Sequence, residues 1–97
     1  MQPDTTRTET TFSTANYWLA AALLAAGQKL VRLEWQEGRA FFIFPEPEKC
    51  EGMSRAHWTG ELMVSTKNFS EAVRSLKSRL YDDKNKYDRY RNTPLTR

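Results

Sequence analysis

The chain has 97 residues, a single cysteine and a formal net charge of +3, with 39% apolar and 12% aromatic residues. This length allows one globular domain, because a second would be too small to bury a core, and the composition excludes a wholly disordered chain. Since Cys50 has no second cysteine to pair with, an intramolecular disulfide is impossible, which favours a reducing, cytoplasmic location.

The charge is unevenly distributed along the chain. Residues 1–66 carry six basic and eight acidic side chains, whereas residues 67–97 carry nine basic and four acidic ones. The positive field therefore belongs to the C-terminal third.

The first elements are a polar segment and an apolar helix. Residues 1–11 are threonine-rich and predict a flexible tail, with a short edge strand around Thr10–Phe12. The run YWLAAALLAAG, residues 17–27, predicts a buried helix that Ser13 or Thr14 caps and its final glycine ends. Eleven residues are too few to cross a bilayer, which needs about 20, and no basic segment precedes them as in a signal peptide. We therefore expect no contact with a membrane.

A β-hairpin follows in residues 29–47, with its turn at Glu37-Gly38. Two registers are open: a two-residue turn pairs Trp35 with Ala40, and a three-residue loop pairs Trp35 with Arg39. In either register the run FFIF gives the second strand two apolar faces, so this strand lies between two layers or presents aromatic side chains to a partner.

The last third of the domain predicts a connector, a strand and a helix. Residues 46–60 have room for a short helix interrupted near Gly52, and ELMV, residues 61–64, predicts a brief strand. Ser65 or Thr66 caps a final helix that we expect to weaken beyond Tyr81 and to end before Pro94. Its apolar residues recur at core spacing: Phe69, Val73, Leu76 and Leu80.

The element order is short strand, helix, β-hairpin, connector, short strand, helix. It predicts a small α+β domain in which helices pack on a small antiparallel sheet. The domain covers residues 12–81, between the tail of residues 1–11 and a basic, tyrosine-rich extension of residues 82–97. Its core is thin, and self-association would enlarge it.

A family resemblance covers residues 12–81 and rests on packing and turn signals. They are the Leu19-Ala20-Ala21 helix ending at Gly27, the Phe42-x-Phe44 strand, the Trp58-x-Gly60 step and the Leu76-Lys77-Ser78 helix. In these features the chain resembles a family of small bacterial and phage domains known only as a domain of unknown function. The resemblance implies one self-contained domain in a bacterial or phage protein and supplies no catalytic or binding residue.

The residues that carry chemistry are sparse. Cys50 and His57 are seven residues apart, about 10 Å along a helix, whereas a nucleophile and its base must lie about 3 Å apart. One cysteine and one histidine are too few for a structural zinc site, and the four glycines are spaced as turns. We therefore expect no enzymatic activity, no cofactor and no metal, and an enzyme using Cys50 and His57 is the weakest alternative.

The C-terminal third suggests binding to nucleic acid. There, lysine and arginine can neutralise phosphates while tyrosines stack on bases. The predicted contact residues are Lys77, Lys84, Lys86, Tyr87, Arg89, Tyr90 and Arg91. The alternative for this segment is a solvated helix end whose charges pair within the helix.

A protein-interaction surface is the second hypothesis. If Phe41 and Ile43 are exposed beside Arg32 and Arg39, the hairpin offers aromatic and basic groups together to a protein partner or to a second copy of the chain. Trp58 is another candidate contact for such a partner.

Overall fold

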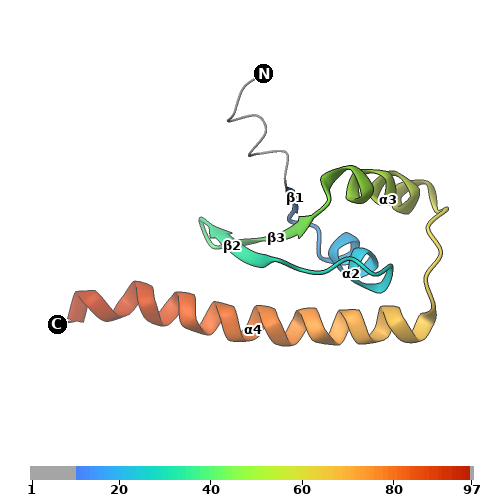
Figure 1. Cartoon of the computed structure of the whole chain (residues 1–97). Helices are drawn as coiled ribbons and strands as arrows, with labels where there is room; N and C mark the ends of the chain where they lie inside the picture. Colours follow the sequence, from blue (N-terminus) through green and yellow to red (C-terminus); the bar gives the residue numbers. More distant parts are fainter. Residues whose placement is uncertain (1–10, 97) are drawn as a thin grey trace, which may run out of the picture.

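Three antiparallel strands form a sheet, and three helices lie beside and below it in Figure 1. The computed structural model describes the backbone of residues 11–96 and the side chains of residues 11–86. The elements in chain order are β1 (Thr11–Thr14), α2 (Tyr17–Ala25), β2 (Arg32–Gln36), β3 (Arg39–Pro45), α3 (Pro47–Thr59) and α4 (Thr66–Thr96). The strand order is β1-β3-β2, with both pairs antiparallel. The predicted fold class, an α+β domain with helices packed on a small antiparallel sheet, is confirmed.

The hairpin adopts the register with a two-residue turn. Trp35 pairs with Ala40, as the shorter loop predicts. Both turn residues are left-handed, with φ of 53° at Glu37 and 80° at Gly38. This conformation matches the right-handed twist of the flanking strands, and glycine adopts it without a steric penalty.

One face of the sheet carries the core. Phe42 and Phe44 are buried on it against the leucines of α2 and Leu76 of α4. On the opposite face Ile43 is also buried, between Ser13 of β1 and Arg32 of β2. Since β3 is the central strand, its neighbours cover its side chains on both faces.

The cap of α2 differs from the prediction. The side chain of Asn16, not Ser13 or Thr14, accepts the hydrogen bond from the backbone N–H of Leu19, at 2.8 Å. Thr14 is still part of β1, where it pairs with β3, and its hydroxyl accepts the N–H of Asn16 at 3.1 Å. The sheet thus holds Thr14 extended and moves the helix start to the next residue with a suitable oxygen.

Two predictions for the connector are wrong. α3 runs without interruption through Gly52, because Cys50 is buried in the core and Met53 packs against it, which offsets the roughly 1 kcal/mol that glycine costs a helix. Residues 61–65 form no strand. The N–H groups of Glu61 and Leu62 instead donate to the carbonyl of Ala56, at 2.7 and 3.1 Å, and cap the end of α3.

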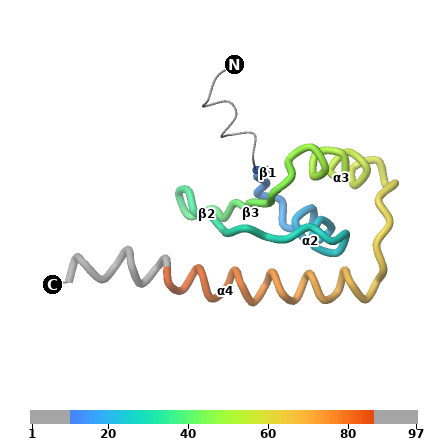
Figure 2. Tube along the Cα trace, in the orientation of Figure 1, coloured from blue at the N-terminus to red at the C-terminus, as the bar shows by residue number. Residues whose placement is uncertain are grey.

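Helix α4 lies along the body and contacts both α2 and β2 (Figures 1 and 2). The Ser65 hydroxyl accepts the N–H of Asn68 at 3.0 Å, so the predicted cap is confirmed. The predicted core positions of α4 are confirmed as well, with Leu76 buried and Phe69, Val73 and Leu80 packed against the core. The helix continues to Thr96, past its predicted end at a proline, which near a helix end removes only one backbone hydrogen bond.

Candidate nucleic-acid-binding face of helix α4

Contacts with α2 set the side of α4 that faces the body. The hydroxyl of Tyr17 donates to the carbonyl of Val73 at 2.7 Å. The Trp18 ring stacks on Phe69, with ring centres 6.3 Å apart and an interplanar angle of 22°. Together with the burial of Leu76, these contacts fix the rotation of α4 about its axis.

One exposed surface of α4, which runs from the side opposite Leu76 to the flank beside Leu80, carries four basic residues and one tyrosine. We call this the outer face, and it consists of Lys67, Arg74, Lys77, Tyr81 and Lys84. All five side chains are exposed, and Tyr81 is 70% exposed. Residues seven apart lie on the same side of a helix, so Lys67, Arg74 and Tyr81 form one row and Lys77 and Lys84 a second. The two rows lie side by side along the helix, so cations and an aromatic ring share one solvent-facing surface.

Three of the four cations on this surface form no ion pair within the described part of the chain. Within the described part of the chain, the ion pairs lie elsewhere: Arg32 with Glu34 at 2.7 Å and Lys49 with Glu46 at 3.6 Å. Among the described residues, Lys67, Arg74 and Lys77 have no carboxylate within ion-pair distance. Glu71 lies four residues after Lys67 and three before Arg74, so it neighbours both cations on the helix surface, but it forms an ion pair with neither. The outer face thus presents its positive charge to solvent.

The structure places the predicted contact residues unequally. Lys77 and Lys84 share the outer face, whereas Lys86 is exposed on a different side of α4. Four further predicted residues lie within the bounds of α4, but their side chains are outside the described residues: Tyr87, Arg89, Tyr90 and Arg91. Their role stays a prediction.

Sequence reasoning missed Lys67, Arg74 and Tyr81 as members of this face. Their signal is the seven-residue spacing on the side of the helix opposite Leu76. It is readable once the apolar positions of α4 have set the phase of the helix.

The hairpin offers less to a partner than its sequence suggests. Ile43 is 3% exposed and Phe41 is partly buried, so the two do not form an open aromatic surface. The guanidinium of Arg32 is engaged by Glu34 on the same strand. Of the predicted hairpin surface, Arg39 remains fully exposed.

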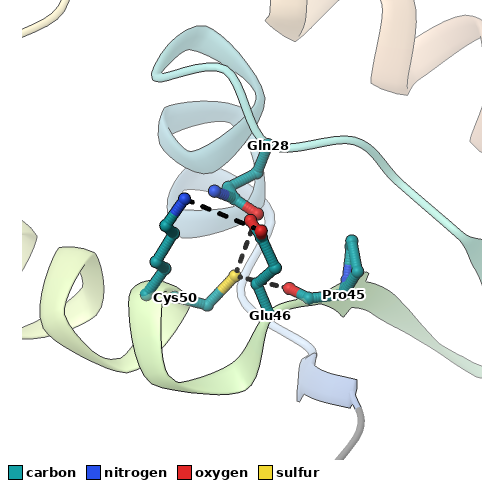
Figure 3. A network of polar contacts seen from close by, with 5 residues as sticks. Gln28, Pro45, Glu46 and Cys50 are labelled. Atoms are coloured by element: carbon teal, nitrogen blue, oxygen red, sulfur yellow. Dashed lines mark hydrogen bonds and ion pairs between the residues drawn. The ribbon is translucent and has the colours of Figure 1, made fainter.

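The thiol of Cys50 is held in a structural network (Figure 3). It is buried, donates to the carbonyl of Pro45 at 3.3 Å and lies 3.7 Å from the side-chain oxygen of Gln28. Burial, and secondarily the negative charge of Glu46, raises the pKa of Cys50, so the thiol stays protonated. His57 lies two turns further along α3 with its ring edge-on to Trp58 at 4.8 Å. This arrangement does not favour a nucleophile–base pair.

Other features add no chemistry to the described residues. A hollow of about 820 Å³ over the start of α3 is lined by carboxylates and cations together, so its charge is mixed. Among the side chains described, those of residues 11–86, no cluster of three potential metal ligands is present. Nor does any helix in that range combine the length and apolar character needed to cross a bilayer.

Comparisons with protein-family models, with curated proteins and with solved structures found no match. The resemblance to the uncharacterised bacterial and phage family therefore stays a prediction. The fold itself defines the class: a small α+β domain with three helices packed on a three-stranded antiparallel sheet.

Proposed function

We propose that the protein is a non-catalytic binding domain, acting in the cytoplasm as an accessory to nucleic-acid transactions, and that the outer face of α4 contacts the phosphates. The observation that carries this proposal is the exposure of Lys67, Arg74 and Lys77 without acidic partners among the described residues, with Tyr81 between the cations.

The arrangement suits a linear polyanion. From Lys67 to Lys84 the face extends about 25 Å along the helix, at 1.5 Å per residue. Duplex DNA carries about one negative charge per 1.7 Å of axis, so several phosphates lie within reach of this length. An exposed tyrosine ring adds a stacking surface worth about 1–3 kcal/mol for an unpaired base. Cations that neutralise the phosphates of a nucleic acid supply affinity without selecting a base sequence.

The test compares two variants with the same change in net charge. One neutralises the four cations of the outer face by Lys67→Gln, Arg74→Gln, Lys77→Gln and Lys84→Gln. The control neutralises four cations outside α4 by Arg32→Gln, Arg39→Gln, Lys49→Gln and Arg55→Gln. Fluorescence anisotropy with single- and double-stranded oligonucleotides, over a series of salt concentrations, gives the slope of log K against log salt for each protein.

The salt slope distinguishes direct contact of the outer face with phosphates from an effect of net charge alone. If all four cations contact phosphates, the outer-face variant loses up to about 3.6 units of slope on duplex or about 2.8 on single strands, while the control keeps the wild-type slope. Equal losses in both variants, or no binding by the wild type at low salt, would overturn the proposal. Tyr81→Ala should weaken binding to single strands more than to duplex.

A second candidate function is supported by exposed aromatic side chains at α2 and α3. Trp18 is 56% exposed although it stacks on Phe69, Trp58 is 63% exposed, and Met63 in the following loop is 87% exposed. Exposed tryptophans are typical of protein contacts, so we propose a protein-interaction module, homodimeric or with another protein, as the alternative. It predicts a mass that rises with concentration in sedimentation analysis and falls to the monomer in Trp18→Ala or Trp58→Ala.

A further inference from the structure

A cleft lies between the end of α2, the segment leading to β2 and helix α4. Its volume is about 230 Å³. Its cationic and hydroxyl groups are Lys29, Ser75 and Arg79, and leucines of α2, α4 and the segment leading to β2 form its apolar part. The helical period places Ser75 and Arg79 on the side of α4 away from the outer face, so the cleft is a separate feature.

Both cations of the cleft are free to meet an anion. Lys29 and Arg79 are exposed, and neither is paired with a carboxylate among the described residues. No acidic residue lines the cleft. Ser75 precedes Arg79 by one helical turn, so the hydroxyl and the guanidinium occupy the same side of α4. The cleft therefore combines two positive charges with a neutral donor.

The segment that carries Lys29 is fixed at both ends. The N–H of Gln28 donates to the carbonyl of Leu23 at 3.0 Å, and the Gln28 side chain is buried beside Cys50. On the other side, the N–H of Val31 donates to the carbonyl of Ile43 at 2.7 Å. Only two residues separate these anchors, so the backbone at Lys29 is held in place before a ligand arrives.

We propose that this cleft binds a phosphomonoester, with the phosphate between Lys29 and Arg79 and the Ser75 hydroxyl donating to it. A phosphomonoester carries a charge of about −1.5 to −2 at neutral pH, which matches the two cations better than a carboxylate does. Its carbon part lies against Leu24 and Leu30. The volume is below the roughly 300–1,000 Å³ of pockets for drug-sized ligands, so the attached group is small.

Such a phosphate has two possible sources. It belongs either to a free small molecule or to the terminal phosphate of a nucleic-acid strand. The first source is independent of the function proposed for the outer face, and the second extends that function to the end of the strand. The shared chemistry is recognition of a monoester dianion by Lys29 and Arg79.

The experiment titrates the full-length protein at constant ionic strength, above about pH 7, and follows backbone amide shifts by NMR. The probes are inorganic phosphate, glycerol phosphate, and a short oligonucleotide with either a 5′-phosphate or a 5′-hydroxyl. The cleft variants are Lys29→Gln and Arg79→Gln. The matched controls are Arg39→Gln on the hairpin and Arg55→Gln on α3, which remove one charge each from exposed positions outside the cleft and outside the outer face, and circular dichroism confirms that every variant is folded.

We expect glycerol phosphate or the 5′-phosphorylated strand to shift amides around residues 24–30 and 75–79. Each cleft variant should bind the preferred probe about tenfold or more weakly, as loss of a charge-assisted hydrogen bond implies, and the controls should not weaken it. A preference for glycerol phosphate identifies a small-molecule site, and a preference for the 5′-phosphorylated over the 5′-hydroxyl strand identifies a strand-end site. Equal weakening in cleft and control variants, or no shifts around residues 24–30 and 75–79 at millimolar glycerol phosphate and phosphorylated strand, would overturn the proposal. Shifts by the strand that are confined to the outer face would overturn the cleft proposal alone, whereas a strand that shifts no amide would overturn both proposals.

Discussion

Replacing Tyr17 by phenylalanine removes the hydroxyl group that ties α2 to α4. That hydroxyl donates to the carbonyl of Val73 at 2.7 Å. The same carbonyl also accepts the N–H four residues further along the helix, so it is not left without a partner in the variant. The ring itself still packs against Trp18 and Phe42. We therefore expect Tyr17→Phe to lower the free energy of unfolding by about 1 kcal/mol, the net value of one hydrogen bond.

The difference in free energy of unfolding between the wild type and Tyr17→Phe should depend on pH. Burial raises the pKa of the Tyr17 phenol above 10.0. The unfolded chain therefore releases this proton at a lower pH than the folded protein does. As pH rises above 10, the wild type loses stability through this group, by at most about 1.4 kcal/mol per pH unit, and Tyr17→Phe does not. The stability gap of about 1 kcal/mol should thus be constant below pH 9 and narrow above pH 10.

The assay is urea unfolding followed by tryptophan fluorescence, at several pH values from 7 to 11. Tyr81→Phe is the control, because Tyr81 is 70% exposed and its loss should change stability by less than about 0.5 kcal/mol. Titration of Cys50 affects all three proteins and cancels. If Tyr17→Phe is no less stable than Tyr81→Phe, the hydroxyl does not anchor α4. If the gap stays constant up to pH 11, the argument from the raised pKa is wrong.

Three further predictions concern the core, two glycines and the thiol. Phe44 is fully buried, so Phe44→Ala should cost about 3–5 kcal/mol in chemical denaturation, and the same change at the partly buried Phe41 clearly less. Gly38 has a φ of 80°, so Gly38→Ala should destabilise the protein by about 1–2 kcal/mol. Gly52 lies in the middle of α3, where an added Cβ meets nothing within 4 Å, so Gly52→Ala should stabilise the protein by about 0.5–1 kcal/mol. Thermal unfolding in which both variants change the stability in the same direction would contradict this. Native Cys50 should react with a thiol reagent only as fast as the protein opens, and rapid labelling at pH 8 without denaturant would show that the thiol is not buried.

Local signals in the sequence were sufficient to locate the hairpin and its turn and to define the inner side of α4, but they did not decide between the two hairpin registers. The Glu37-Gly38 turn requires left-handed backbone at both positions, which glycine tolerates and which sets the two-residue register. In α4 the spacing of Phe69 and Leu76 defines an apolar stripe without reference to the rest of the chain. Both features depend on residues close in sequence, so they can be predicted from it.

The two predictions that were wrong failed because backbone capping and core burial outweighed the local residue preference. ELMV has the composition of a strand, but the amides of Glu61 and Leu62 are already bonded to Ala56 and cannot join a sheet. Gly52 weakens a helix, but burial of Cys50 two residues earlier holds α3 together. Neither the capping bonds nor the burial is visible in the local residue pattern.

The candidate site was only partly predictable. The excess of basic residues after position 66 indicated the segment, and two of the contacts predicted from it, Lys77 and Lys84, lie on one exposed face, while their role in binding stays a prediction. Which further residues share that face depends on the rotation of α4, and contacts with Tyr17 and Trp18 fix that rotation. The phosphate cleft could not be predicted, because Lys29 and Arg79 are fifty residues apart and meet only through the packing of α2 on α4.

The distribution of charge over the molecule implies that a polyanion approaches from one side. Residues 46–61, which include α3, carry four acidic and two basic side chains, while residues 66–86 of α4 carry six basic and three acidic ones. Helices α3 and α4 lie on opposite sides of α2 in Figure 1. At physiological salt the screening length is about 8 Å, shorter than the thickness of such a body, so each side acts on its surroundings almost independently. A nucleic acid would be attracted to α4 and weakly repelled by α3, and one protein would therefore engage one strand or duplex instead of bridging two.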